Sequence, residues 1–130
     1  MVGQAKLKTR EPFMALVIED QPEVRGLAAA IIDETSLEVA EAASAEQALR
    51  FLRERAPDVA MIFVDVILPG GIDGIDVARI AERSWPWIKV VVTSGAMDRP
   101  MCELPRTAKF MPKPWRAFDV LLEAERAAAH

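Results

Sequence analysis

The stretch VAMIFVD, residues 59–65, decides the fold of this 130-residue chain. Its six consecutive apolar residues, 59–64, are typical of a strand buried on both faces, and the run ends at an acid, Asp65. It is far shorter than the ~18 apolar residues that a membrane-spanning helix needs. Strands buried on both faces belong to parallel sheets covered by helices, so this stretch predicts the central strand of an α/β fold.

Other apolar stretches predict four more strands, and helical periodicities lie between the strands. The predicted strands are residues 13–18, 37–42, 88–93 and 107–111, and the predicted helices begin near Pro22 or span about 45–55, 75–84 and 115–127. Pro100 and Pro105 interrupt the segment before the last strand, so we expect a short or irregular fourth helix there. Strands that alternate with helices predict a doubly wound parallel sheet with right-handed crossovers.

Helix caps and apolar faces follow from the same pattern. Ser44 with Gln47 predicts a capping box, and Asp73 and Asp76 are expected to cap the third helix. The inward face is expected at Val24, Leu27, Ala28, Ile31 and Ile32 in the first helix, at Ala48, Leu49 and Leu52 in the second, and at Phe118, Leu121 and Leu122 in the last.

The composition indicates one globular domain, with 52% hydrophobic and 28% charged residues. We expect a flexible lead-in at residues 1–12 and a single domain at 13–128. A net charge of −4 argues against direct nucleic-acid binding. The one cysteine, Cys102, excludes an internal disulfide and suits the cytoplasm, and no secretion signal or membrane span is expected. Because the only histidine is His130, a Ser-His-Asp triad is improbable.

Chemically active side chains follow four of the predicted strands. Ligands bind outside the carboxyl ends of the strands in an open α/β sheet, so residues at those ends meet. The strand ends carry Glu19 and Asp20, Asp65, Thr93 and Ser94, and Lys113. Each residue alone has a structural explanation, since acids cap helices and Lys-Pro ends a strand. Together they predict a functional site of acids, a hydroxyl and a lysine.

Four segments resemble the receiver domain of two-component response regulators. They are LVIEDQPEVR (16–25), VDVILPGGIDG (64–74), VVVTSGA (90–96) and FMPKPW (110–115), and the resemblance extends from residue 13 to 127. It implies a flavodoxin-like five-stranded sheet of order 2-1-3-4-5. It also implies a phosphoacceptor in two-component signal transduction, which receives a phosphoryl group from a histidine kinase or phosphotransferase. Such a protein assists its own phosphorylation and dephosphorylation but is not otherwise an enzyme.

The resemblance implies a role for each residue at the strand ends. Asp65 matches the phosphoacceptor, Ser94 the conserved hydroxyl and Lys113 the phosphoryl-pairing lysine, with a cis Lys113–Pro114 bond. Ser94 and Phe110 match the switch pair. Thr93 is expected in the packing. The implied metal is Mg²⁺, with Mn²⁺ as a possible substitute. Its ligands would be Glu19, Asp20, Asp65 and the backbone carbonyl of Ile67.

Three features depart from the family pattern. Glu19 stands where Asp is usual, the loop LPGGIDG is one residue longer than usual, and Phe110 replaces the frequent Tyr. Neither Ile67 nor Ala96, two residues past the acceptor and the hydroxyl, can orient an attacking water, so we expect a long-lived phosphorylated form.

Two other functions remain open. One is a pseudo-receiver, a phosphate-independent interaction module, which the intact Asp20, Asp65, Ser94 and Lys113 disfavour. The other is a haloacid-dehalogenase-like phosphatase. That family needs a second Asp two residues past the nucleophile, where this chain has Ile67.

The expected partners are a histidine kinase or phosphotransferase and an output protein. The output contact is expected on the face formed by the short fourth helix, the fifth strand (107–111) and the last helix (115–127). A homodimer is possible. Only one helix follows Lys113 and Pro114. We therefore expect a stand-alone receiver if the chain is complete, or the receiver part of a longer protein if it is not.

Overall fold

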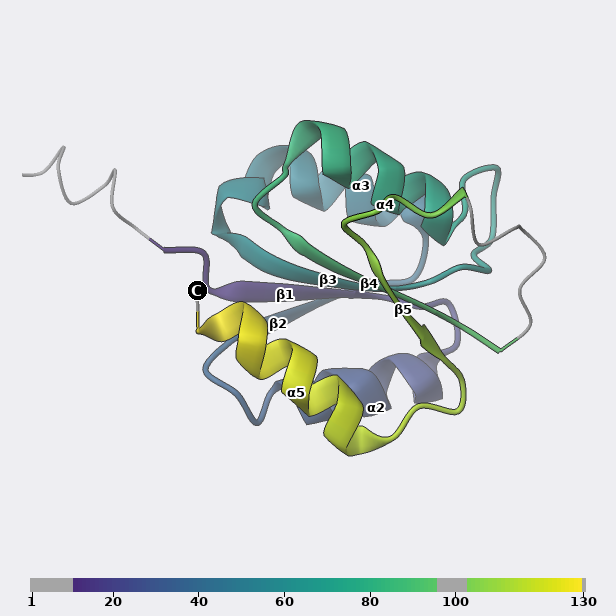
Figure 1. Ribbon diagram of the computed structural model, residues 1–130. Coiled ribbons are helices and arrows are strands. Elements are labelled where there is room, and N and C mark those ends of the chain that lie inside the picture. Colours follow the sequence, from purple (N-terminus) through teal and green to yellow (C-terminus); the bar gives the residue numbers. More distant parts are fainter. Residues whose placement is uncertain (1–10, 96–102, 130) are drawn as a thin grey trace, which may run out of the picture.

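The computed structural model describes residues 11–95 and 103–129. Within these residues, five parallel strands form one sheet in the order β2-β1-β3-β4-β5, as predicted (Figure 1). The strands are β1 (Met14–Ile18), β2 (Glu38–Ala42), β3 (Val59–Asp65), β4 (Lys89–Ser94) and β5 (Lys109–Pro112). The doubly wound α/β prediction is therefore confirmed.

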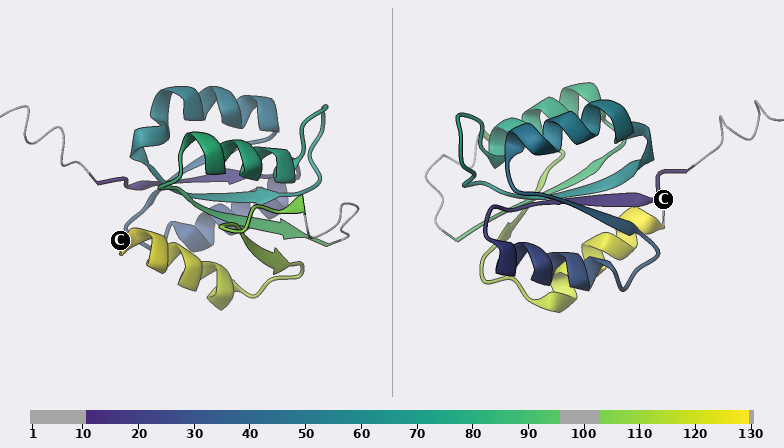
Figure 2. Two further views of the ribbon diagram at one scale, coloured as in Figure 1. Left: turned by 45° about the horizontal axis from the view of Figure 1, so that its top comes forward. Right: turned by 180° about the vertical axis from the view of Figure 1, so that it is seen from behind.

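Helices cover both faces of the sheet. They are α2 (Pro22–Ile32), α3 (Ala45–Arg55), α4 (Gly74–Ser84) and α5 (Ala117–Ala128), with a short 3-10 helix η1 (Ala56–Asp58) before β3. Helices α3 and α4 lie on one face, and α2 and α5 on the other (Figures 1 and 2). None of the helices in residues 11–95 and 103–129 has the length and apolar character to cross a membrane. Several predictions concern residues that the structure does not describe. They are those for Cys102, His130, most of the lead-in and most of the fourth helix.

The core consists of one hydrophobic cluster on each face of the sheet, and β3 contributes to both. All seven residues of β3 are buried. Ile62 and Val64 join the cluster under α3 and α4, whereas Met61 and Phe63 join the cluster under α2 and α5. Alternate side chains of a strand point to opposite faces, so a strand that feeds two clusters must be apolar throughout. This explains the unbroken apolar run that identified β3.

The predicted caps at Asp73 and Asp76, the Ser44 cap and the apolar face of α3 are confirmed, whereas the reciprocal bond of the predicted Ser44–Gln47 capping box goes to Ala43 instead of Ser44. Asp73 and Asp76 form a capping box, in which each backbone N–H donates to the other side chain at 3.0 Å. Ser44 accepts from the N–H of Gln47 at 3.1 Å. The Gln47 side chain accepts from Ala43, one residue before the cap. Ala48, Leu49 and Leu52 are buried as expected.

The predicted apolar stripe of α5 is wrong. Phe118 is 68% exposed, and the buried residues of α5 are Val120, Glu123, Ala124 and Ala127. A charged residue lies in the middle of this face, so hydrophobic periodicity points to the neighbouring face instead. Leu27 on α2 is likewise exposed, whereas Ala28, Ala29 and Ile32 are buried. The facing helices α2 and α5 both bury alanines, which let two helices approach closely.

The buried carboxylate of Glu123 joins three elements. Its oxygens lie 3.0 Å from Lys89 Nζ on β4, 3.3 Å from Lys109 Nζ on β5 and 3.3 Å from Arg126 Nη1 on α5. Burial alone would raise the pKa of Glu123, but hydrogen bonds and charge attraction from Lys89 and Lys109 lower it on balance. The carboxylate is therefore held charged and fastens α5 to the β4–β5 edge.

Replacing Glu123 by Gln is expected to lower the free energy of unfolding by about 1–3 kcal/mol at neutral pH, because the cations lose a charged hydrogen-bond acceptor. The lowered pKa means that the folded chain binds this proton less readily than the unfolded chain. The contribution of Glu123 is thus complete above its ordinary pKa of 4.5 and is lost as the pH falls below that value. Urea unfolding at several pH values measures both effects. Glu125→Gln, at an exposed position of the same helix, is the matched control. Equal effects of the two variants would contradict the role of Glu123.

Candidate functional site

The carboxyl ends of β1, β3, β4 and β5 bring the predicted site residues to one edge of the sheet. Backbone hydrogen bonds continue past the strands and fix this edge. The N–H of Val66 donates to the carbonyl of Thr93, and the N–H of Lys113 donates to the carbonyl of Ser94, both at 2.9 Å. The Lys113–Pro114 peptide bond is cis, as predicted.

Three carboxylates gather at this edge. Oxygen atoms of Glu19, Asp20 and Asp65 all lie within 4.8 Å of one another. Glu19 is 4% and Asp65 6% exposed, while Asp20 faces solvent. Buried carboxylates of like charge repel unless a cation neutralises them. Hard oxygen ligands on a partly open rim fit Mg²⁺, so these residues suit the metal that the sequence implied.

Lys113 bridges the two buried carboxylates. Its Nζ lies 3.1 Å from Glu19 Oε1 and 3.0 Å from Asp65 Oδ2. Burial alone would lower the pKa of this ammonium, but its hydrogen bonds to Asp65 and Glu19 raise the pKa overall. Burial raises the pKa of Glu19, and the adjacent Asp65 raises it further against the hydrogen bonds from Gln21 and Lys113. The Asp65–Lys113 proximity matches the expectation, whereas the Glu19–Lys113 contact was not predicted from the sequence.

The hydroxyl group of Ser94 is buried beside this edge. Ser94 Oγ and Thr93 Oγ1 have no hydrogen-bond partner among residues 11–95 and 103–129. Thr93 is fully buried within the strand packing, as expected. A buried hydroxyl without a partner costs about 1–3 kcal/mol, so a new hydrogen-bond acceptor beside Ser94 would be favourable.

Phe110 and Ile67 are two further residues that the sequence predicted for the site. Phe110 is half-buried on β5, packs against the hydrophobic cluster under α3 and α4, and lines a hollow of about 360 Å³ between β5 and α5. Ile67 is 49% exposed, and its N–H donates to Asp65 Oδ1 at 3.3 Å. Ala96 lies outside the described residues.

Two glycines shape the loop between β3 and α4. Gly70 has a φ of +90°, a left-handed conformation that side chains disfavour. Gly74 begins α4 directly against the backbone of Asp65. A Cβ on Gly74 would collide with the carbonyl oxygen of Asp65 and lie 2.7 Å from its carbonyl carbon. Gly74 ends the GGIDG segment that carried the resemblance, but its close approach to Asp65 was not predicted from the sequence.

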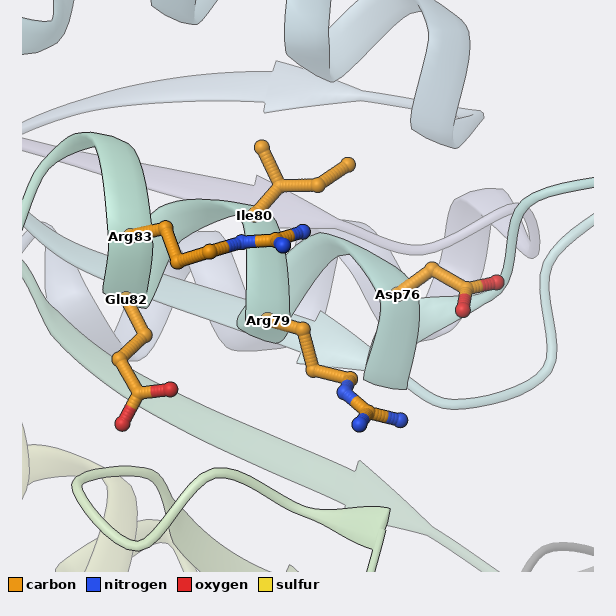
Figure 3. Close-up of a pocket in the computed structure, with 5 residues that line it drawn as sticks. All are labelled: Asp76, Arg79, Ile80, Glu82 and Arg83. Atoms are coloured by element: carbon orange, nitrogen blue, oxygen red, sulfur yellow. The ribbon is translucent and has the colours of Figure 1, made fainter.

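Hollows elsewhere on the surface differ from this edge. A mostly apolar groove of about 440 Å³ adjoins the cluster and is lined by Val24, Leu27, Gly95, Lys113, Pro114 and Trp115. Another, of about 490 Å³, lies on α4 alone (Figure 3). There, Arg79 and Glu82 point to one side of the helix and Ile80 to the other. Because these polar groups do not converge, the hollow on α4 has no features of a ligand site.

Comparison with known proteins agrees with the geometry. The sequence profile of the response regulator receiver domain matches residues 15–122. The chain belongs to the receiver domain family. The receiver is 31% identical over 116 residues to the nitrogen assimilation regulatory protein NtrX of Azorhizobium caulinodans, covering 86% of this chain and 25% of that protein. It is 34% identical over 103 residues to the sensor kinase CckA of Brucella abortus, covering 77% of this chain and 11% of that protein.

Solved structures show the same fold. The receiver domain of NtrX from Brucella abortus superimposes with a TM-score of 0.76 at 31% identity, over 88% of this chain and 98% of that one. A receiver domain from Clostridium thermocellum gives a TM-score of 0.80 at 22% identity, over 90% of this chain and 94% of that one.

Family membership defines the general activity. Receivers of two-component response regulators are phosphoacceptor switches rather than conventional enzymes. They bind Mg²⁺ at an acidic pocket and interact with histidine kinases and output domains. In this receiver, Glu19, Asp20 and Asp65 form the acidic group that corresponds to such a pocket. The chain spans a quarter of NtrX, so the activity of that whole protein does not transfer to it.

Replacing Gly74 by Ala is expected to displace the start of α4 from Asp65, since an extra methyl group has no space there. The free energy of unfolding should fall by about 1–3 kcal/mol. Gly71→Ala is the matched control in the same loop, because a Cβ on Gly71 would have no neighbour within 4 Å. Chemical unfolding compares the two variants. If Gly74→Ala were as stable as Gly71→Ala, the close approach at Asp65 would not constrain the loop.

Proposed function

We propose that Asp65 is the phosphoacceptor of this receiver and that a histidine kinase or histidine phosphotransferase supplies the phosphoryl group. The observation that carries the proposal is the set of charges around Asp65. Its carboxylate lies at the end of the central strand, 3.0 Å from Lys113 Nζ and within 4.8 Å of carboxylate oxygens of Glu19 and Asp20. Such a site can offer a nucleophile together with cations that neutralise a phosphoryl group.

In the proposed transfer, a carboxylate oxygen of Asp65 forms a bond to phosphorus while the phosphorus–nitrogen bond of the donor phosphohistidine breaks. The imidazole leaves and takes up a proton from solvent. Mg²⁺ held by Glu19, Asp20, Asp65 and the Ile67 carbonyl would neutralise charge on the phosphoryl oxygens. Lys113 supplies a compact positive charge that hydrogen-bonds to the same group.

Ser94 and Phe110 are the proposed switch. The buried hydroxyl of Ser94 lacks a partner among the described residues, so a new phosphoryl oxygen on Asp65 would give it an acceptor. Movement of Ser94 toward Asp65 would leave space beside β4. Phe110 is half-buried on the adjacent strand β5, pairs with Val92 of β4 and can turn into that space. The consequence is a change in the surface between β5 and α5.

Two surfaces suit the two proposed partners. The donor must bring its phosphohistidine to Asp65, and the groove lined by Leu27, Pro114 and Trp115 adjoins the acceptor through Lys113. We assign this groove to the kinase or phosphotransferase. The output protein, or a second receiver, is assigned to the face that includes β5 and α5, and Phe118 of α5 is exposed to solvent.

The phosphatase alternative is disfavoured because Ile67, an exposed apolar residue, stands where that family needs an acid. The pseudo-receiver alternative is disfavoured because Asp65 and Lys113 remain paired and charged groups surround them.

Acetyl phosphate with Mg²⁺ is expected to add one phosphoryl group to the protein, located on Asp65 by peptide mapping. Asp65→Asn is expected to remove the adduct, as is chelation of the metal, because the nucleophile or its charge neutralisation is lost. Asp58→Asn, at the opposite end of β3, is the matched control and should label normally. Undiminished labelling of Asp65→Asn would refute the assignment.

The phosphorylated receiver is expected to decay slowly, because exposed Ile67 shields the phosphoryl group and offers no polar atom to a hydrolytic water. Ile67→Asn and Ala96→Glu should shorten the half-life by about 2–10-fold, equivalent to about 0.4–1.4 kcal/mol in the barrier. Mass spectrometry of the purified phosphoprotein over time measures the decay. Ile67→Val keeps an apolar side chain and serves as control. Unchanged or slower decay in the polar variants would rule out this explanation.

A further inference from the structure

Glu19 is held in one orientation by its neighbours. Its carboxylate Oε2 accepts from the N–H of Gln21 at 3.1 Å, and its backbone carbonyl accepts from Arg25 Nη1 at 2.9 Å. The N–H of Glu19 donates to the carbonyl of Ala42 at 3.1 Å. Arg25 is itself paired with Glu41 at 3.1 Å. These contacts leave the second oxygen, Oε1, directed to Lys113.

The contact between Glu19 and Lys113 depends on the length of the side chain. Glu19 Oε1 lies 3.1 Å from Lys113 Nζ. An aspartate at this position would be shorter by one carbon–carbon bond, about 1.5 Å. Its carboxylate would then stop beyond hydrogen-bond distance of the ammonium, which ends at about 3.2 Å. Lys113 would keep its contact with Asp65 alone.

The oxygens that Lys113 contacts belong to the group that suits a divalent cation. Glu19, Asp20 and Asp65 share the acidic cluster, and Lys113 bonds to the two buried members of it. An ammonium and a metal ion that neutralise the same carboxylates compete for them. The cation already present in the chain therefore opposes the entry of an external one.

We propose that Glu19 is a positioning residue that holds Lys113 across the pocket, and that Mg²⁺ binding must displace this lysine from Glu19. The inference rests on the proposed function, because the released lysine is the one that would pair with the phosphoryl group. Binding of the metal and release of Lys113 become one exchange. Lys113 is then free for the phosphoryl group only when the metal is present. Without the metal, phosphorylation therefore lacks both the charge neutralisation by Mg²⁺ and a lysine released from Glu19.

A double-mutant cycle on Mg²⁺ binding tests the exchange. The four proteins are the parent, Glu19→Asp, Lys113→Met and the double variant, and the dissociation constants come from calorimetry or tryptophan fluorescence. With Lys113 present, Glu19→Asp keeps the charge but loses the reach, and should tighten Mg²⁺ binding about 3–10-fold, the range of a partly buried ion pair. With Lys113→Met, the same change should alter binding by less than about twofold. Arg53→Met, exposed near the end of α3, controls for the loss of one positive charge.

Two outcomes would overturn the inference. One is an equal change in affinity for Glu19→Asp in both backgrounds, which would make Glu19 a metal ligand with no action on Lys113. The other is weaker Mg²⁺ binding for Glu19→Asp when Lys113 is present.

A second measurement separates this inference from the proposed function. In thermal unfolding with the metal chelated, Glu19→Asp should lower the Tm only when Lys113 is present. This result requires neither metal nor phosphoryl transfer. Failure of acetyl phosphate to label Asp65 would reject the proposed function. It would not affect the conclusion that the double-mutant cycle draws about Glu19 and Lys113. An equal Tm shift in both backgrounds would reject the positioning role even if labelling succeeds.

Discussion

Two buried carboxylates side by side are the constraint on which this receiver depends. Glu19 directly follows β1 and Asp65 ends β3, and the parallel pairing of these two strands brings both residues to one edge and removes both side chains from water. Like charges in such a place are unfavourable without a cation. Lys113 follows the edge strand β5, and its side chain reaches both carboxylates because β5 ends at the same edge of the sheet as β1 and β3. The order of the strands thus brings together three segments that are distant in the sequence, so that the charge of Lys113 partly neutralises those of Glu19 and Asp65.

The sequence was sufficient for the sheet because burial of a parallel strand leaves a direct trace. The apolar run of β3, the proline at the start of α2, the Ser44 cap of α3 and the capping box of α4 are each local, and each was confirmed. The edge of the sheet could be inferred because the carboxyl ends of parallel strands coincide. Strand order came from the family resemblance and not from the strands themselves.

Features that depend on contacts between distant residues could not be predicted. The buried face of α5 was misassigned because Glu123 interrupts it, and the lysines of β4 and β5, distant in the sequence, help to explain why a carboxylate is stable there. The closeness of Gly74 to Asp65 depends on how the loop folds back. The Glu19–Lys113 contact joins residues 94 positions apart and depends on one methylene group.

The two ends of the sheet have a consequence for how the receiver meets other chains. An edge strand offers unpaired backbone groups to any other strand. In this receiver β5 has only four residues, with a lysine, Lys109, at one end and a proline without an N–H, Pro112, at the other. The opposite edge, β2, carries two acids, Glu38 and Glu41, and charged side chains on an edge strand disfavour pairing with another strand. Both edges therefore discourage continuation of the sheet into a neighbouring molecule, so partners are expected to contact the outer faces of the elements rather than to add a strand.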